Sequence, residues 1–164
     1  MTPQDIRRIR LKNEYQSMKD IQGKYIKWKA IKGIAPYIEE YQITLKIKSI
    51  LDSQPTYRSS HDVKLIIPSD YPASPAVITM ITTPFVFHPN WYDNGLWCNG
   101  NWNASEELGD FVMRMAKTLQ YDFSITNQKS PANKTANNWF ISKKSSGLFP
   151  CDKNDLYKKR MSFF

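Results

Sequence analysis

Apolar positions near the start of the chain recur at helical spacing. Ile6, Ile9, Tyr15 and Met18 follow one another at intervals that place them along one side of a helix. Thr2 stands before a proline, and an acidic residue follows it three positions later, a pattern typical of a helix N-terminus. We therefore expect a helix that begins after Thr2 and ends near residue 20.

The pattern then changes to short runs rich in β-branched and aromatic residues. These runs predict strands over residues 25–31, 38–50, 63–67 and 77–81, separated by segments that contain Gly, Pro, Ser or Asp. In the second run, polar residues alternate with Tyr41, Ile43, Leu45 and Ile47. One face of the sheet should therefore be buried under helices, while the other is wet or lightly covered.

A long segment without sustained periodicity, residues 83–104, follows the last strand. Beyond it, a helix is expected from Ser105, and another from Ser130 toward residue 143. The tail, residues 152–164, is a candidate for a further short helix. The order predicts an α+β fold: an N-terminal helix, a four-stranded antiparallel meander sheet, a long active-site loop, and then two or three C-terminal helices.

Composition narrows the classes of protein that fit this pattern. The 164 residues are 41% hydrophobic, which is enough apolar material for one domain, residues 1–164, to fold by itself. No apolar run reaches the roughly 20 residues needed to cross a bilayer, and the N-terminus lacks a secretory signal, so we expect a cytoplasmic protein. The net charge of +8 favours acidic partners, either proteins or nucleic acid.

The two cysteines, Cys98 and Cys151, are far apart in the sequence and form neither a disulfide framework nor a Cys-rich zinc site. We therefore expect no metal and no cofactor. The thiolate of a free cysteine is a strong nucleophile, and a thioester keeps enough acyl-transfer potential to react later with an amine. The alternative is that each cysteine is a small buried hydrophobe.

The long loop contains His88-Pro89-Asn90, then an Asp-Asn-Gly turn, then Cys98 eight residues after Asn90, with Trp102 beyond. At these residues the sequence resembles the ubiquitin-conjugating enzyme family. The hallmark of that family is an HPN tripeptide after the fourth strand, an Asn-Gly turn, and an acceptor cysteine eight residues past the asparagine, followed by a tryptophan.

Three further segments carry the resemblance and extend it over residues 6–142, leaving residues 143–164 as a tail. They are the YPxxPP-like turn Tyr71-Pro72-Ala73-Ser74-Pro75, the first-helix residues Arg10, Leu11, Glu14, Tyr15 and Met18, and the gate segment Ser130-Pro131-Ala132-Asn133. Three features depart from the family: the short interval from Cys98 to Trp102, the long stretch 121–129, and Tyr57-Arg58-Ser59-Ser60 in place of a Tyr-x-Gly-Gly hairpin. The sequence therefore resembles a divergent member of this family, and a bacterial-type member is one candidate.

The resemblance implies a role for each residue of the loop. Cys98 would carry a modifier as a thioester and pass it to a lysine, while Asn90 would stabilise the oxyanion that forms during transfer. Ser130 would lie at the gate and orient the incoming amine. His88 and Pro89 would be structural. The alternatives are that Asn90 is an ordinary turn residue and that Ser130 is a helix N-cap.

The resemblance also implies the partners. They are ubiquitin or a ubiquitin-like protein, an activating enzyme, and a substrate protein or a ligase. The activating enzyme would bind the basic first helix, with Arg10 at the matching position and Arg7, Arg8 and Lys12 in support. A conventional RING ligase is disfavoured, because Ala73 is small where a large apolar anchor often sits.

Two other readings remain. An inactive family variant would act as a binding scaffold, but such variants usually lack the acceptor cysteine that Cys98 provides. A nucleic-acid-binding domain would account for the charge and the abundant aromatic residues, but the chain has no recognisable nucleic-acid-binding motif.

Overall fold

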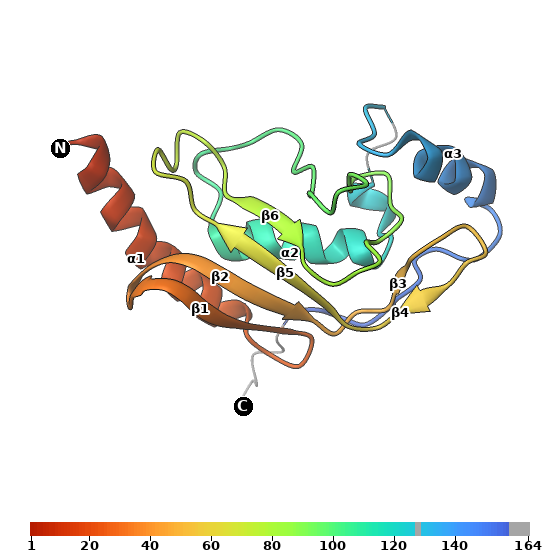
Figure 1. The fold of residues 1–164 in the computed structure, drawn as a ribbon, viewed down its shortest axis with the longest axis horizontal. Helices are drawn as coiled ribbons and strands as arrows, with labels where there is room; N and C mark the ends of the chain where they lie inside the picture. The colour runs from red at the N-terminus through yellow and green to blue at the C-terminus, as the bar shows by residue number, and fades with distance from the viewer. Residues whose placement is uncertain (127–128, 158–164) are drawn as a thin grey trace, which may run out of the picture.

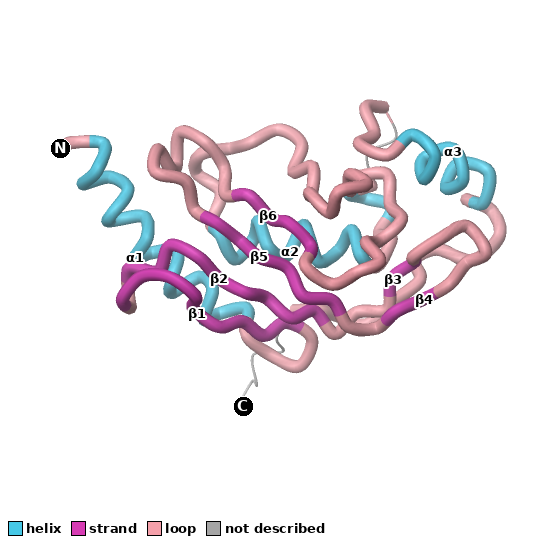
Figure 2. The backbone as a smooth tube through the Cα atoms, viewed as in Figure 1, coloured by secondary structure: helices cyan, strands magenta, loops and turns pink. Residues whose placement is uncertain are grey.

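A four-stranded antiparallel sheet forms the centre of the fold (Figures 1 and 2). This computed structural model describes residues 1–126 and 129–157. The strands are β1 (Ile26–Ile34), β2 (Tyr37–Leu45), β5 (His61–Ile66) and β6 (Val77–Met80). They pair in the order β1-β2-β5-β6, so the predicted meander is confirmed. A separate two-stranded sheet joins β3 (Ser49–Ile50) to β4 (Tyr57–Arg58).

Helices flank this sheet. Helix α1 (Pro3–Ile21) and helix α2 (Leu108–Leu119) pack against one face. Helix α3 (Lys134–Lys143) lies at the end of the molecule away from α1 (Figure 1), where its Phe140 joins a buried group with Ile50 of β3. A short 3-10 helix, η1 (Phe123–Ile125), follows α2. The predicted α+β class is therefore confirmed. None of the helices in the described part of the chain combines the length and the apolar character needed to span a bilayer.

The predicted start of α1 is confirmed in atomic detail. Thr2 Oγ1 accepts a hydrogen bond from the Asp5 amide at 3.1 Å, and the Asp5 carboxylate accepts one from the Thr2 amide at 2.9 Å. This reciprocal pair is a capping box, which satisfies two amides that have no partner inside the helix.

The predicted second strand was too long. Its alternation is confirmed, because Tyr41, Ile43 and Leu45 are all fully buried. However, the strand ends at Leu45, and the Lys48 amide donates to the carboxylate of Asp152 at 2.8 Å. This long-range hydrogen bond replaces a strand partner, so the following residues leave the main sheet and form β3.

Helix α2 begins later than predicted, at Leu108 and not at Ser105. The first amides of the helix bind side chains of α1: Leu108 N donates to Glu14 Oε1 at 3.1 Å, and Gly109 N donates to Ser17 Oγ at 3.0 Å. A Cβ at Gly109 would lie 2.7 Å from the Ser17 carbonyl oxygen, so this close approach requires glycine. The N-terminus of α2 is therefore capped by another helix.

The predicted start of the last helix near Ser130 was also wrong. Helix α3 begins at Lys134, and its N-cap is Asn133, whose side-chain oxygen accepts from Ala136 N at 3.0 Å. Residues 152–157 form no helix, and the rest of the predicted tail helix lies outside the described residues.

Two groups of buried side chains stabilise the fold. The larger lies between the sheet, α1 and α2. The smaller is aromatic and gathers Tyr121, Phe140 and Phe149 with Trp139 packed against them. Tyr121 follows α2 with φ of 58°, a left-handed conformation that costs a bulky residue about 1–2 kcal/mol. Complete burial of its ring offsets that cost.

Candidate active site

Residues 90–98 form a tight hairpin that brings Cys98 back to Asn90. Cys98 N donates to Asn90 O at 2.9 Å, and Tyr92 N donates to Leu96 O at 2.8 Å. The interval of eight residues is therefore the length of this hairpin: the chain leaves Asn90, turns, and returns with the cysteine paired to it.

The returning arm of the hairpin extends the main sheet. Met80 N donates to Gly95 O at 2.8 Å, and Trp97 N donates to Ile78 O at 3.0 Å, so this arm lies beside β6. Gly95 has φ of 90°, and a Cβ there would approach the Phe85 ring to 2.9 Å. The loop was expected to be irregular apart from its turn, and this part of it is instead paired with β6.

His88 and Pro89 support the first arm. The buried ring of His88 accepts from the Asn90 amide through Nδ1 at 2.9 Å, and burial lowers the pKa of His88 to about 3, so the ring is neutral near pH 7. The Pro89 carbonyl accepts from Ala132 N at 2.8 Å and from Asn133 N at 3.2 Å. These bonds attach the segment around Ser130 to the hairpin.

Cys98, Asn90 and Ser130 therefore line one cavity, with a volume of about 250 Å³. Asn90 Nδ2 donates to the carbonyl of Ile125 at 3.0 Å, which orients the carboxamide. The thiol of Cys98 is partly exposed, and Ser130 is exposed. The three residues chosen from the sequence for chemistry lie together, although they span some forty positions of the chain.

Two residues of this site were missed by sequence reasoning. The exposed hydroxyl of Tyr92 lies near the Cys98 side chain, and negative charge on that sulfur raises the pKa of Tyr92. Tyr92 could have been noticed in the sequence, because it directly precedes the Asp93-Asn94-Gly95 turn. Arg114 of α2 also lines the cavity, and no local pattern marks it among the other charged residues of that helix.

Cys151 has a different environment from Cys98. Its sulfur lies 3.2 Å from the Lys48 carbonyl oxygen and 3.4 Å from that of Leu119, and burial raises its pKa to about 12. The thiol therefore stays protonated near neutral pH and is a poor nucleophile. Neither cysteine is in a disulfide, and residues 1–126 and 129–157 contain no cluster of side chains suited to a metal ion.

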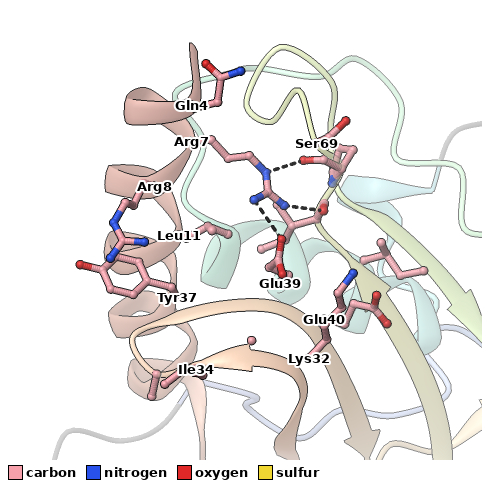
Figure 3. A pocket seen from close by; sticks show the side chains of 15 residues that line it. Gln4, Arg7, Arg8, Leu11, Lys32, Ile34, Tyr37, Glu39, Glu40 and Ser69 are labelled. Carbon is pink, nitrogen blue, oxygen red and sulfur yellow. Dashed lines mark hydrogen bonds and ion pairs between the residues drawn. The ribbon is translucent and has the colours of Figure 1, made fainter. Parts of the chain in front are cut away.

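The four basic residues predicted to bind a partner differ in their availability. Arg7 donates to the Pro68 carbonyl at 2.9 Å and pairs with Glu39 at 3.1 Å (Figure 3). Arg10 pairs with the buried carboxylate of Glu14 at 3.1 Å and donates to the Tyr71 hydroxyl and to the Glu106 carbonyl, each at 3.2 Å. Both therefore hold α1 to the rest of the molecule.

Arg8 and Lys12 are the exposed members of the set. The Arg8 guanidinium lies 3.7 Å from the centre of the Tyr37 ring, at the edge of a groove between α1 and the β1–β2 turn (Figure 3). Their charges face outward and can meet an acidic partner.

Human ubiquitin-conjugating enzyme E2 G1 has a similar structure. The match covers 73% of this chain and 97% of that chain, with a TM-score of 0.53 and 16% sequence identity. The chain has the fold of the ubiquitin-conjugating enzymes. At this identity the similarity establishes the fold alone. Comparison of the sequence with protein-family models gave no match, and neither did comparison with curated proteins.

Proposed function

We propose that this protein accepts a ubiquitin-like modifier as a thioester on Cys98 and transfers it to the amine of a lysine. The observation that carries the proposal is the placement of Cys98 within a fold of this class: a partly exposed thiol, paired through its backbone with Asn90, at the wall of a polar cavity. Cys151 lies in a setting that suppresses the same chemistry.

The reaction has two acyl transfers. In the first, the Cys98 thiolate attacks the modifier's thioester on an activating enzyme; a new carbon–sulfur bond forms, and the activating enzyme's thiolate leaves. In the second, a neutral amine attacks the Cys98 thioester. A carbon–nitrogen bond forms, the carbon–sulfur bond breaks, Cys98 leaves as a thiolate, and the nitrogen loses a proton.

The residues around Cys98 supply the parts that the second transfer needs. The Asn90 carboxamide, oriented by Ile125, donates to the oxyanion that develops when the amine attacks. The Ser130 hydroxyl orients the amine, but as a neutral group it gives no direct stabilisation to an ammonium. The Tyr92 hydroxyl lies near the sulfur, where it can donate a hydrogen bond as negative charge returns to the thiolate.

The outward-facing charge of α1 is suited to recruiting the activating enzyme. Arg8 and Lys12 are exposed, whereas Arg7 and Arg10 are used in internal contacts. A net charge of +8 adds long-range attraction toward an acidic domain. We therefore assign the first encounter with the activating enzyme to Arg8 and Lys12.

A thioester assay tests the proposal. The protein is incubated with an activating enzyme, a ubiquitin-like modifier and ATP, and the products are separated with and without reductant. A reductant-sensitive adduct is expected on the wild type and on the matched control Cys151→Ala, but not on Cys98→Ala. An adduct that persists on Cys98→Ala, or that requires Cys151, contradicts the proposal.

A further inference from the structure

The backbone is held differently on the two sides of Cys98. Before it, Trp97 N bonds to Ile78 O at 3.0 Å, and Cys98 N bonds to Asn90 O at 2.9 Å. After it, within the described residues, no backbone–backbone hydrogen bond involves residues 99–101. Gly100 there has φ of 74°, and a Cβ added to it would meet no atom within 4 Å. In the described part of the chain, backbone hydrogen bonds therefore do not hold residues 99–101 in place, and only side-chain contacts can do so.

Arg114 of α2 provides contacts to both neighbours of Cys98. Its Nη1 donates to the Asn99 carbonyl at 3.0 Å, and its guanidinium lies 5.4 Å from the centre of the Trp97 ring. One rigid, planar group thus touches the residue before the thiol and the residue after it.

The guanidinium is itself held in place. Its Nε and Nη2 donate to the two carboxylate oxygens of Glu106 at 2.8 and 2.9 Å, a bidentate pair. The backbone carbonyl of Glu106 accepts in turn from Arg10 at 3.2 Å. This second layer limits the positions that the Arg114 side chain can take, and hence the positions of the Asn99 peptide.

We propose that Arg114 is a positioning residue for Cys98, fixing the Asn99–Gly100 peptide so that the sulfur faces Asn90 across the cavity. The consequence for transfer rests on the function proposed above, whereas the anchoring of residues 99–101 does not. The Arg114 side chain is 34% exposed, so solvent screens its ion pair, and we expect Arg114→Ala to remain folded.

The first test needs no modifier. The ¹H–¹⁵N heteronuclear NOE of the Gly100 amide is measured in the wild type, in Arg114→Ala and in Lys117→Ala. Lys117 is a matched control, because it lies on the same helix and its ammonium contacts the ring of Tyr157. The NOE of Gly100 should fall in Arg114→Ala, reporting faster motion, and stay at the wild-type value in Lys117→Ala. An unchanged NOE in Arg114→Ala overturns the proposal.

The second test measures single-turnover discharge of the loaded protein over a range of lysine concentrations. Arg114→Ala should lower the maximal rate about 10-fold, because small misplacements of reacting groups are costly, and leave the half-saturating lysine concentration unchanged. The maximal rate of Arg114→Lys should lie between those of the wild type and Arg114→Ala, since lysine keeps one charged donor group but loses the bidentate pair. Discharge of Arg114→Ala at the rate of Lys117→Ala overturns the proposal.

The two measurements separate this inference from the proposed function. A wild type that never forms a thioester removes the function, and a lower Gly100 NOE in Arg114→Ala then still supports the anchoring. A wild type that loads and discharges normally, beside an Arg114→Ala that behaves identically, keeps the function and removes the positioning role.

Discussion

Asn90 takes part in the site through its backbone and its side chain separately. Its amide donates to His88, and its carbonyl accepts from Cys98, so the backbone alone fixes the hairpin. Its carboxamide donates to Ile125 and lines the cavity. Truncating the side chain therefore removes the carboxamide while leaving the hydrogen bonds that place Cys98.

This separation makes Asn90→Ala informative. Discharge of a preloaded protein to free lysine should slow by about 10²-fold, the usual loss for one oxyanion donor, while loading changes much less. Single-turnover assays of both steps measure the difference, with the exposed Asn138→Ala as a control for loss of an amide elsewhere. Normal discharge from a folded Asn90→Ala would show that the carboxamide serves only the loop.

At the scale of the element, the two faces of helix α1 have different roles. Glu14 lies on the inner face and binds Arg10, the hydroxyl of Tyr71 and the first amide of α2, so it joins three segments of the chain. Lys12 lies on the outer face and is exposed. A charge change on the inner face should therefore lower stability, whereas a charge change on the outer face should alter association with a partner.

Reversing the charge at Lys12 tests the outer face. Lys12→Glu should slow loading by the activating enzyme and flatten the salt dependence of loading, because steering between opposite charges is screened by salt. Discharge of preloaded protein should stay normal. Lys27→Glu, the same change at an exposed site on β1, is the control. Equal loading rates for the two variants would remove α1 as the docking element.

At the scale of the whole molecule, two buried histidines link stability to pH. Burial, reinforced by the charge of Arg58, lowers the pKa of His61 to about 4, and burial lowers that of His88 to about 3. An unfolded chain would titrate near 6.5 at both positions. Between these values the unfolded state binds more protons, so the stabilisation is complete above the unfolded pKa and is lost as pH falls toward the folded values.

The free energy of unfolding should therefore decrease between about pH 7 and about pH 5, above the range where most carboxylates titrate, by up to about 1.4 kcal/mol per pH unit for each histidine. Denaturant titrations at several pH values measure this slope. His61→Gln should lower stability at neutral pH and make the slope shallower. A stability independent of pH over this interval would contradict the prediction.

Much of the fold and of the site could be predicted because the relevant interactions are local. The cap at Thr2, the alternation along β2 and the turn at Asp93-Asn94-Gly95 each depend on residues within a few positions of one another. Such patterns leave a direct trace in the sequence, and the resulting element lengths place the thiol.

The tertiary structure decided what depends on residues distant in the chain. Ser17 and Glu14 determine where α2 begins, and Asp152 ends the second strand by binding the amide of Lys48. Internal ion pairs likewise engage Arg7 and Arg10, two of the four basic residues of α1. Another ion pair, with Glu106, holds Arg114, which also donates to the Asn99 carbonyl. A local pattern shows which groups can donate or accept, but the partner that each one meets is settled only when the chain has packed.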